Sequence, residues 1–278
     1  MTAEATPPMP YFGGKTTLAP RIAALFPSHE HYVEPYCGSL AVLLAKPRSP
    51  METVNDLDGD LMTFWRVLRE QPADLVRVCA LTPHSRAEHQ AAYDRGSDLG
   101  DLERARRVWV QLTQGRAGSR KRTGWRHYVN PVGSSIGMPD YLDGYVGRML
   151  PAAERLAGIS LESMPALDLV TKYGAEPRVL LYVDPPYLGS TRNSGGYVVE
   201  MAGEGDHRTL AAALRACRAA VVLSGYPSDL YDRDLYAGWD RVAFKAGTGQ
   251  SHVWENRTEV LWSNRPLGAP HLFSEAVS

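Results

Sequence analysis

Residues 179–187 constrain the fold more than any other stretch of this 278-residue chain. Five apolar or aromatic residues, from Val179 to Val183, lead directly into Asp184, two prolines and Tyr187. A short run of β-prone residues of this kind is typical of a buried strand. The two prolines cannot continue a hydrogen-bonded ladder, so the strand must end there. Asp184 is therefore predicted at the carboxyl end of a strand, the edge at which open α/β sheets bind ligands.

The residues after this strand offer a specific set of polar groups. Pro185 and Pro186 have fixed backbone angles and leave carbonyl groups without a local N–H partner. Tyr187 adds a flat ring beside the Asp184 carboxylate. Two acceptors and a stacking face suit a planar group that carries an NH2. The alternative is a strand that ends in a plain turn, with Tyr187 in the hydrophobic core.

An earlier segment combines a strand, a glycine turn and a helix. Residues 31–39 are predicted to form the strand and the turn, and a helix is expected from Ser39 to about Ala45. A glycine turn that leads into a helix N-terminus is typical of nucleotide sites. The residues predicted to bind a cofactor here are Glu34, Pro35, Gly38 and Ser39.

Residues 52–56 are predicted to form a further strand that ends in Asp56. An acid at this place in a dinucleotide-binding fold hydrogen-bonds ribose hydroxyls, and the same geometry suits any adenosyl ligand. The alternative for Asp56 is the N-cap of a helix over 57–70. Asp58 or Asp60 could cap that helix instead, so the ligand role is favoured.

Residues 11–17 contain two adjacent glycines, which allow a ligand to approach the backbone closely. Tyr11 provides a stacking face and Lys15 a cation beside them. The spacing of a phosphate-binding P-loop is absent, because Met9 stands where that motif needs its first glycine. A helix capped by a threonine at residue 16 or 17 is expected to run to about residue 26.

The middle of the chain interrupts the alternation of strands and helices after Pro72. Helices are expected over 84–94 and 99–113, followed by a loop-like stretch to residue 139.

Residues 104–139 contain eight Lys or Arg residues and no Asp or Glu. Cations interleaved with aromatic and small polar residues suit contacts to phosphates and base edges. The predicted DNA-binding residues are Arg116, Arg120, Lys121, Arg122, Trp125 and Arg126. The alternative is a solvated basic loop.

The second half returns to strands and helices. Helices are predicted over 141–156, 167–173 and 206–217, and strands over 158–162, 219–225, 240–244 and 258–263.

A loop over 189–196 carries Ser, Thr, Arg and Asn side chains that suit phosphate or base contacts. His207 is expected as a surface residue of a first helical turn rather than as a catalytic base. The predicted domains are 1–71 with 158–278 for catalysis, and 72–157 as an inserted domain.

Composition limits the possible binding partners and the cellular compartment of the protein. A formal net charge of −1 makes any nucleic-acid contact local. The three cysteines form no C-x-x-C pair, so neither a zinc site nor a disulfide framework is expected. No apolar run approaches the roughly 20 residues that span a bilayer, and the first ten residues lack signal-peptide features. These features predict a soluble, cytoplasmic protein with no membrane or metal partner, and they indicate no oligomeric state.

Five segments, in this order, resemble motifs of the DNA adenine methylase family. They are 11–15 (Tyr-Phe-Gly-Gly-Lys), 33–39 (Val-Glu-Pro-Tyr-Cys-Gly-Ser), 54–56 (Val-Asn-Asp), 184–187 (Asp-Pro-Pro-Tyr) and 257–262 (Arg-Thr-Glu-Val-Leu-Trp). The resemblance implies an α/β fold, with a Rossmann-like methyltransferase sheet, helices on both of its faces, and an inserted, mainly helical DNA-recognition domain. It implies S-adenosylmethionine as the methyl donor and N6 of adenine in duplex DNA as the acceptor. Tyr11, Lys15, Asp56 and Asp184 match the family's cofactor-contacting positions.

Two places depart from the family's pattern. After Gly38 the turn continues with Ser39 and Leu40, where relatives often carry a second glycine. Met164 and Pro165 stand where relatives often have an acid near the adenine ring of the cofactor. The turn's backbone path and that wall of the pocket are therefore expected to differ.

The resemblance and the residue chemistry together imply a mechanism. Hydrogen bonds from the amino group to the Asp184 carboxylate and the Pro185 carbonyl would draw the nitrogen toward tetrahedral geometry, while Tyr187 stacks on the base. The predicted catalytic residues are Asp184, Pro185, Pro186 and Tyr187. A base inside a duplex cannot reach such a site, so it must flip out. The alternatives are an N4-cytosine DNA methyltransferase, an N6-adenine RNA methyltransferase and a non-catalytic DNA-binding protein of the same fold.

Overall fold

The computed structural model describes residues 5–94, 96, 98–128, 137–189, 201, 203–247 and 256–268. Within these residues seven strands form one sheet in the order β3-β2-β1-β4-β5-β7-β6. The strands are β1 (His31–Glu34), β2 (Met51–Asn55), β3 (Ser160–Glu162), β4 (Val179–Val183), β5 (Ala220–Gly225), β6 (Asp240–Gly247) and β7 (Asn256–Ser263). Strands β3, β2, β1, β4 and β5 pair in parallel, whereas β7 runs antiparallel to both β5 and β6.

The central strands are buried on both faces of the sheet. Neighbouring residues along a strand point to opposite faces, and all five residues of β4 are buried. Leu180 and Val222 belong to the core on one face, and Leu181 and Leu223 belong to the core on the other. Burial on both faces explains why the sequence of β4 is a continuous apolar run rather than an alternating one.

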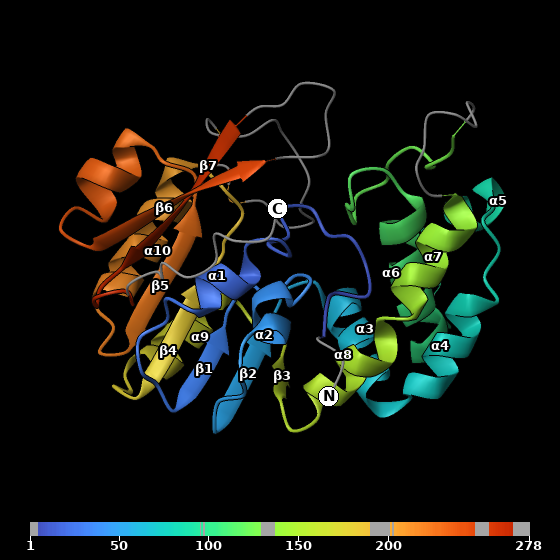
Figure 1. The fold of residues 1–278 in the computed structure, drawn as a ribbon, viewed down its shortest axis with the longest axis horizontal. Helices are drawn as coiled ribbons and strands as arrows, with labels where there is room; N and C mark the ends of the chain where they lie inside the picture. Colours follow the sequence, from blue (N-terminus) through green and yellow to red (C-terminus); the bar gives the residue numbers. More distant parts are fainter. Residues whose placement is uncertain are drawn as a thin grey trace, which may run out of the picture.

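Helices cover each face. Helices α1 (Ala19–Ala23) and α2 (Ala41–Ala45) contribute to the core on the first face. Helices α9 (Ala166–Gly174) and α10 (Glu204–Arg215), with the π-helical segment η2 (Leu230–Leu235), contribute to the core on the second. Figure 1 shows α1 and α2 in front of the sheet, with α9 and α10 behind it.

The remaining helices gather beside the β3 edge of the sheet (Figure 1). They are α3 (Gly59–Glu70), α4 (Pro72–Ala80), α5 (Arg86–Ala91), α6 (Asp101–Gln114), α7 (Met138–Val146) and α8 (Met149–Leu156). Trp65 of α3, Trp109 of α6 and Leu156 of α8 lie in the same core cluster as Leu180 of β4. The sheet and these helices therefore share one continuous core, and α3 packs against α6.

The structure confirms the predicted strands and differs from the sequence analysis in two helical details. Helix α1 is only five residues long and has no side-chain cap, so neither Thr16 nor Thr17 caps it. Helix α4 was not expected; Pro72 occupies its first turn, where a missing N–H costs no hydrogen bond. The loop predicted over 189–196 lies outside the described residues after Gly189.

Candidate active site and cofactor cavity

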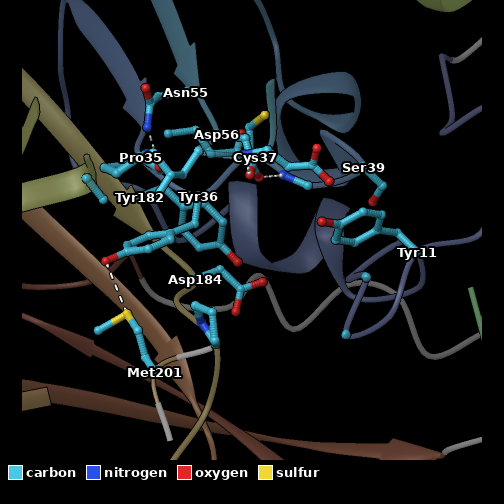
Figure 2. A pocket seen from close by; sticks show the side chains of 18 of the residues that line it. Tyr11, Pro35, Tyr36, Cys37, Ser39, Asn55, Asp56, Tyr182, Asp184 and Met201 are labelled. Carbon is cyan, nitrogen blue, oxygen red and sulfur yellow. Dashed lines mark hydrogen bonds between the residues drawn. The ribbon is translucent and has the colours of Figure 1, made fainter. Parts of the chain in front are cut away.

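A cavity of about 370 Å³ opens at the carboxyl ends of β1, β2 and β4 (Figure 2). The parallel strands end together at this edge, so the loops that follow them meet there. All the residues that the sequence analysis predicted to contact a cofactor line this one cavity: Tyr11, Lys15, Glu34, Pro35, Gly38, Ser39, Asp56 and Asp184. Of the predicted catalytic residues, Asp184 and Pro186 line it as well.

The turn after β1 forms one wall of the cavity. Gly38 has a φ of 44° and Leu40 a φ of 56°, so the turn passes twice through left-handed backbone geometry. A Cβ at Gly38 would lie 2.8 Å from Cε1 of Tyr11, so the absence of a side chain lets the Tyr11 ring pack directly on the turn. The chain thus keeps a tight turn by placing Leu40, rather than a second glycine, in the left-handed region.

Asp56 is held by backbone donors at the end of β2. Its Oδ2 accepts from the Gly38 N–H at 3.1 Å, and its Oδ1 accepts from the Asp58 N–H at 3.0 Å. Burial raises the pKa of Asp56 to about 6, while these N–H groups oppose the shift. Asp58 caps α3 instead, accepting from Asp60 and Leu61. Asp56 is therefore not the helix cap, and its carboxyl group remains at the cavity wall.

A group of apolar residues also lines the cavity. Asn55 fixes this part of the cavity wall, because its side chain hydrogen-bonds the carbonyl of Pro35 and both backbone polar groups of Met164. Pro165 and Leu167 line the cavity next to this anchor, at the place where an acid would be expected in relatives. Leu57 also lines it and is 48% exposed. The wall is therefore suited to the face of an apolar ring rather than to a charged group.

Glu34 is a buried acid at the end of β1. The Tyr32 hydroxyl donates to its Oε2 at 2.9 Å. Burial raises the pKa of Glu34 to about 8, and the nearby charge of Asp184 adds to this shift, while the Tyr32 hydrogen bond opposes it. At neutral pH Glu34 is therefore largely protonated, and it presents a neutral carboxyl group to the cavity.

Asp184 is paired with Lys15 at the end of β4. The Lys15 Nζ lies 3.0 Å from Asp184 Oδ2 and donates to the Gly13 carbonyl at 2.8 Å. The Tyr187 hydroxyl lies 3.0 Å from Asp184 Oδ1. The segment that follows β4 therefore brings a carboxylate, an ammonium group and a phenol hydroxyl into direct contact.

Tyr187 is more enclosed than the sequence analysis expected. It is only 6% exposed. The Lys15 Nζ lies 4.8 Å from the centroid of its ring, and Tyr226 packs edge-on with a centroid separation of 4.6 Å. Lys15 thus covers part of the face on which a base was expected to stack.

Glu259 of β7 is a member of this cluster that the sequence analysis did not identify as a site residue. It is buried and contacts the Tyr187 hydroxyl, and its Oε1 accepts from the Ser224 hydroxyl at 2.7 Å. The Lys15 Nζ lies 3.7 Å from the same oxygen. Burial raises the pKa of Glu259, while Lys15 opposes this effect. The available signal was an acid next to the apolar run Val260 to Trp262 of a predicted strand.

His207 is buried, contrary to the surface position that the sequence analysis expected. It is 0% exposed, and its Nδ1 lies 2.7 Å from the Tyr231 hydroxyl. Its Nε2 lies 2.7 Å from the Met201 carbonyl. Met201 lines the cavity and receives a 3.5 Å contact from the Tyr36 hydroxyl (Figure 2). His207 therefore supports the cavity wall from behind and does not face the cavity itself.

Four arginines of the basic stretch are engaged with acids. Arg104, Arg106 and Arg107 form ion pairs with Asp60, Glu88 and Glu103. The Arg120 side chain is 3% exposed; its Nε lies 3.0 Å from Asp58 Oδ2, and its NH2 group lies 3.0 Å from Asp60 Oδ2. The prediction that Arg120 faces DNA thus conflicts with the structure, because a buried, doubly paired guanidinium cannot reach a phosphate.

The other basic residues of this stretch differ from Arg120. Arg116 and Arg122 are exposed, and Lys121 and Arg126 are half-buried. Arg122 and Arg126 lie over the rings of Tyr93 and Tyr141. Trp125 stacks between His84 and His127, with centroid separations of 4.4 and 5.2 Å. Among the described residues, Arg116, Arg122 and Arg126 form no ion pair with a carboxylate.

Neither a metal cluster nor a membrane-spanning helix is found in the described part of the chain. No three His, Cys, Asp or Glu side chains there are grouped so that they could hold a metal ion. None of the helices described there is both long and apolar enough to cross a bilayer.

Comparisons with known proteins place this geometry in context. Residues 11–102 match the family model for the D12 class N6 adenine-specific DNA methyltransferase. Two solved structures of the rRNA methyltransferase aviRa from Streptomyces viridochromogenes are similar to the chain. One has 18% identity and a TM-score of 0.39 over 93% of this chain and 88% of that chain. The other has 17% identity and a TM-score of 0.33 over 87% of this chain and 80% of that chain. No curated protein matches the chain.

The sheet order, the helices on both faces and the cavity at the carboxyl edge define an α/β protein with a Rossmann-like methyltransferase fold. The chain is a methyltransferase. The family match over residues 11–102 supports the resemblance to the DNA adenine methylase family that the motifs carry.

Proposed function

We propose that this protein transfers a methyl group from S-adenosylmethionine to N6 of a flipped-out adenine in duplex DNA. The observation that carries the proposal is that Asp184 lies in the same cavity as Tyr11, Gly38 and Asp56. A carboxylate that can accept an amino hydrogen is thereby placed next to residues suited to an adenosyl ligand.

The cavity fits S-adenosylmethionine in size and in its polar groups. Its volume falls within the range usual for small-molecule sites, about 300–1,000 Å³. Asp56 would accept from ribose hydroxyls, Leu57 and Leu167 would cover the adenine ring, and Lys15 would pair with the carboxylate of the ligand. When bound, S-adenosylmethionine supplies a methyl group on a positively charged sulfur.

The segment 184–187 supports the acceptor step. The Asp184 carboxylate and the Pro185 carbonyl would accept the two amino hydrogens and hold the nitrogen in line for attack, so that positioning supplies much of the rate. Lys15 lies over the Tyr187 ring, so a base can stack on this ring only after the ammonium group moves aside. Pairing of Lys15 with the carboxylate of a bound cofactor would move the ammonium group aside.

The helical part supports an interaction with DNA. Arg116 and Arg122 are exposed and Arg126 is half-buried, and Trp125 stacks with two histidines in the same stretch. Exposed guanidinium groups beside aromatic rings suit phosphate and base contacts. We therefore propose that residues 72–157 recognise DNA and that residues 1–71 and 158–278 carry out catalysis. Arg120 is not included in the DNA-contacting set.

The test is methyl transfer from labelled S-adenosylmethionine to duplex DNA, single-stranded DNA and RNA, followed by mass spectrometry of the nucleosides. We expect N6-methyladenine in duplex DNA. N4-methylcytosine without N6-methyladenine, or label in RNA alone, would overturn the acceptor. Binding to DNA with no transfer to any acceptor would favour a non-catalytic protein of the same fold.

A further inference from the structure

The hydroxyl of Tyr187 lies between two carboxyl groups. One neighbour is Asp184 Oδ1, at 3.0 Å, and the other is Glu259 Oε1. Asp184 directly follows β4, whereas Glu259 belongs to β7 and is 72 residues after Tyr187. Glu259 does not line the cavity, so it can reach the reaction only through its neighbours.

A phenol hydroxyl has one proton and can donate it to only one of these oxygens at a time. When Tyr187 donates to Asp184, it occupies one carboxylate oxygen and lowers its capacity to accept another hydrogen. Lys15 already pairs with the other oxygen of Asp184. When Tyr187 donates to Glu259 instead, Asp184 Oδ1 is available to the amino group of an acceptor base.

We propose that Glu259 is a positioning residue that draws the Tyr187 hydroxyl proton away from Asp184, so that Asp184 can accept an amino hydrogen of the substrate. This inference rests on the proposed methyl transfer. No bond to Glu259 is made or broken in the reaction, and Glu259 acts through the direction of one hydrogen bond.

The surroundings of Glu259 favour its role as the acceptor. The Ser224 hydroxyl donates to Oε1 at 2.7 Å, and the Lys15 ammonium lies 3.7 Å from the same oxygen. The hydroxyl donor and the nearby cation both lower the pKa of Glu259, against the larger effect of burial, which raises it. In its ionised form Glu259 is a strong acceptor, and in that form it competes for the Tyr187 proton.

The test is a double-mutant cycle on kcat for methyl transfer to the identified acceptor. Glu259→Ala should lower kcat about ten- to a hundredfold, as expected when a hydrogen bond to a charged group is lost. Tyr187→Phe alone should keep much of the activity. Adding Tyr187→Phe to Glu259→Ala should raise kcat several-fold above Glu259→Ala alone, because the competing donor to Asp184 is then gone.

Three controls separate this role from a structural one. Glu259→Gln keeps an acceptor oxygen and should retain more activity than Glu259→Ala. Ser224→Ala removes the other donor to Glu259 and should lower kcat less than Glu259→Ala does. Thermal melting and cofactor affinity should show that each variant is folded.

If wild-type protein transfers methyl groups but the double variant is no faster than Glu259→Ala, the role of Glu259 is wrong and the proposed function stands. If wild-type protein transfers no methyl group to any acceptor, the proposed function itself is wrong.

Discussion

The cavity edge of the sheet and the basic stretch of residues 104–126 use charge in different ways. At the cavity, Lys15 lies within ion-pair distance of both Asp184 and Glu259, and all three side chains are largely enclosed. In the basic stretch, Arg120 is enclosed and paired, whereas Arg122 is exposed on the same loop. The difference shows that a charge is available to an outside partner only where the fold leaves it uncompensated.

The two regions meet at Asp58. This residue caps α3, follows the Asp56 loop and pairs with Arg120. The Phe12 N–H also donates to the Gly118 carbonyl at 2.8 Å, which joins the first segment of the cavity to the basic loop. Gly118 has a φ of 59°, and a Cβ there would lie 3.0 Å from the Tyr11 nitrogen, so a side chain would disturb this contact. The contrast between enclosed and exposed charges can be tested residue by residue.

The largest expected effect is at the cavity edge. Asp184→Ala should abolish methyl transfer, a loss of at least roughly 10²–10⁴-fold, because the amino group loses its acceptor. The rate of labelled-methyl transfer measures it. Asp168→Ala on the exposed side of α9 is the matched control and should transfer at the wild-type rate. Normal turnover by folded Asp184→Ala protein would contradict the mechanism.

The next largest effect is expected on the free energy of unfolding, and it should distinguish the enclosed Arg120 from the exposed Arg122. Arg120→Ala should lower the free energy of unfolding by about 3–5 kcal/mol, because it removes an enclosed guanidinium that pairs with both Asp58 and Asp60. Arg122→Ala should change this free energy by less than about 0.5 kcal/mol. Urea denaturation measures both. Equal stabilities for the two variants would show that Arg120 is not enclosed in solution.

A smaller effect concerns cofactor binding by Asp56. Asp56→Ala should weaken binding of S-adenosylmethionine by about 1.5–3 kcal/mol, while DNA binding without cofactor should hardly change. The pKa of Asp56 is raised to about 6, so the accepting carboxylate form predominates above that pH and is lost below it. Affinity should therefore fall as the pH drops through about 6.

Calorimetry across this pH range checks both parts of this prediction. Asp56→Asn should show a flatter dependence, since its amide does not titrate. An unaltered affinity in both variants would reject a cofactor role for Asp56.

The smallest effects are expected from the exposed cations. Arg116→Ala and Arg122→Ala together should weaken binding to all DNA sequences and reduce the salt dependence by up to about two units of slope. Binding titrations at several salt concentrations measure this slope. Arg77→Ala on α4, where the arginine is also exposed, is the control and should leave the slope unchanged. An unchanged slope in the double variant would indicate that the loop is simply solvated.

Local sequence patterns are enough to predict the strand that ends at Asp184, the glycine turn after β1 and the meeting of the cofactor motifs at one edge of the sheet. These features follow from local rules: apolar runs form buried strands, prolines end them, and parallel strands end at a common edge. Figure 2 shows Tyr11, Asp56 and Asp184 around the one cavity that this rule anticipated.

Which charged and polar side chains meet depends on how distant parts of the chain pack together. Arg120 and Asp58 are 62 residues apart, and Tyr187 and Glu259 are 72 residues apart, so no local pattern reports either contact. For the same reason His207 could be mistaken for a surface residue, because its partner Tyr231 lies 24 residues further on. Burial and pairing depend on the packing of distant segments, and this packing fixes which charges stay inside and which remain available to an outside partner.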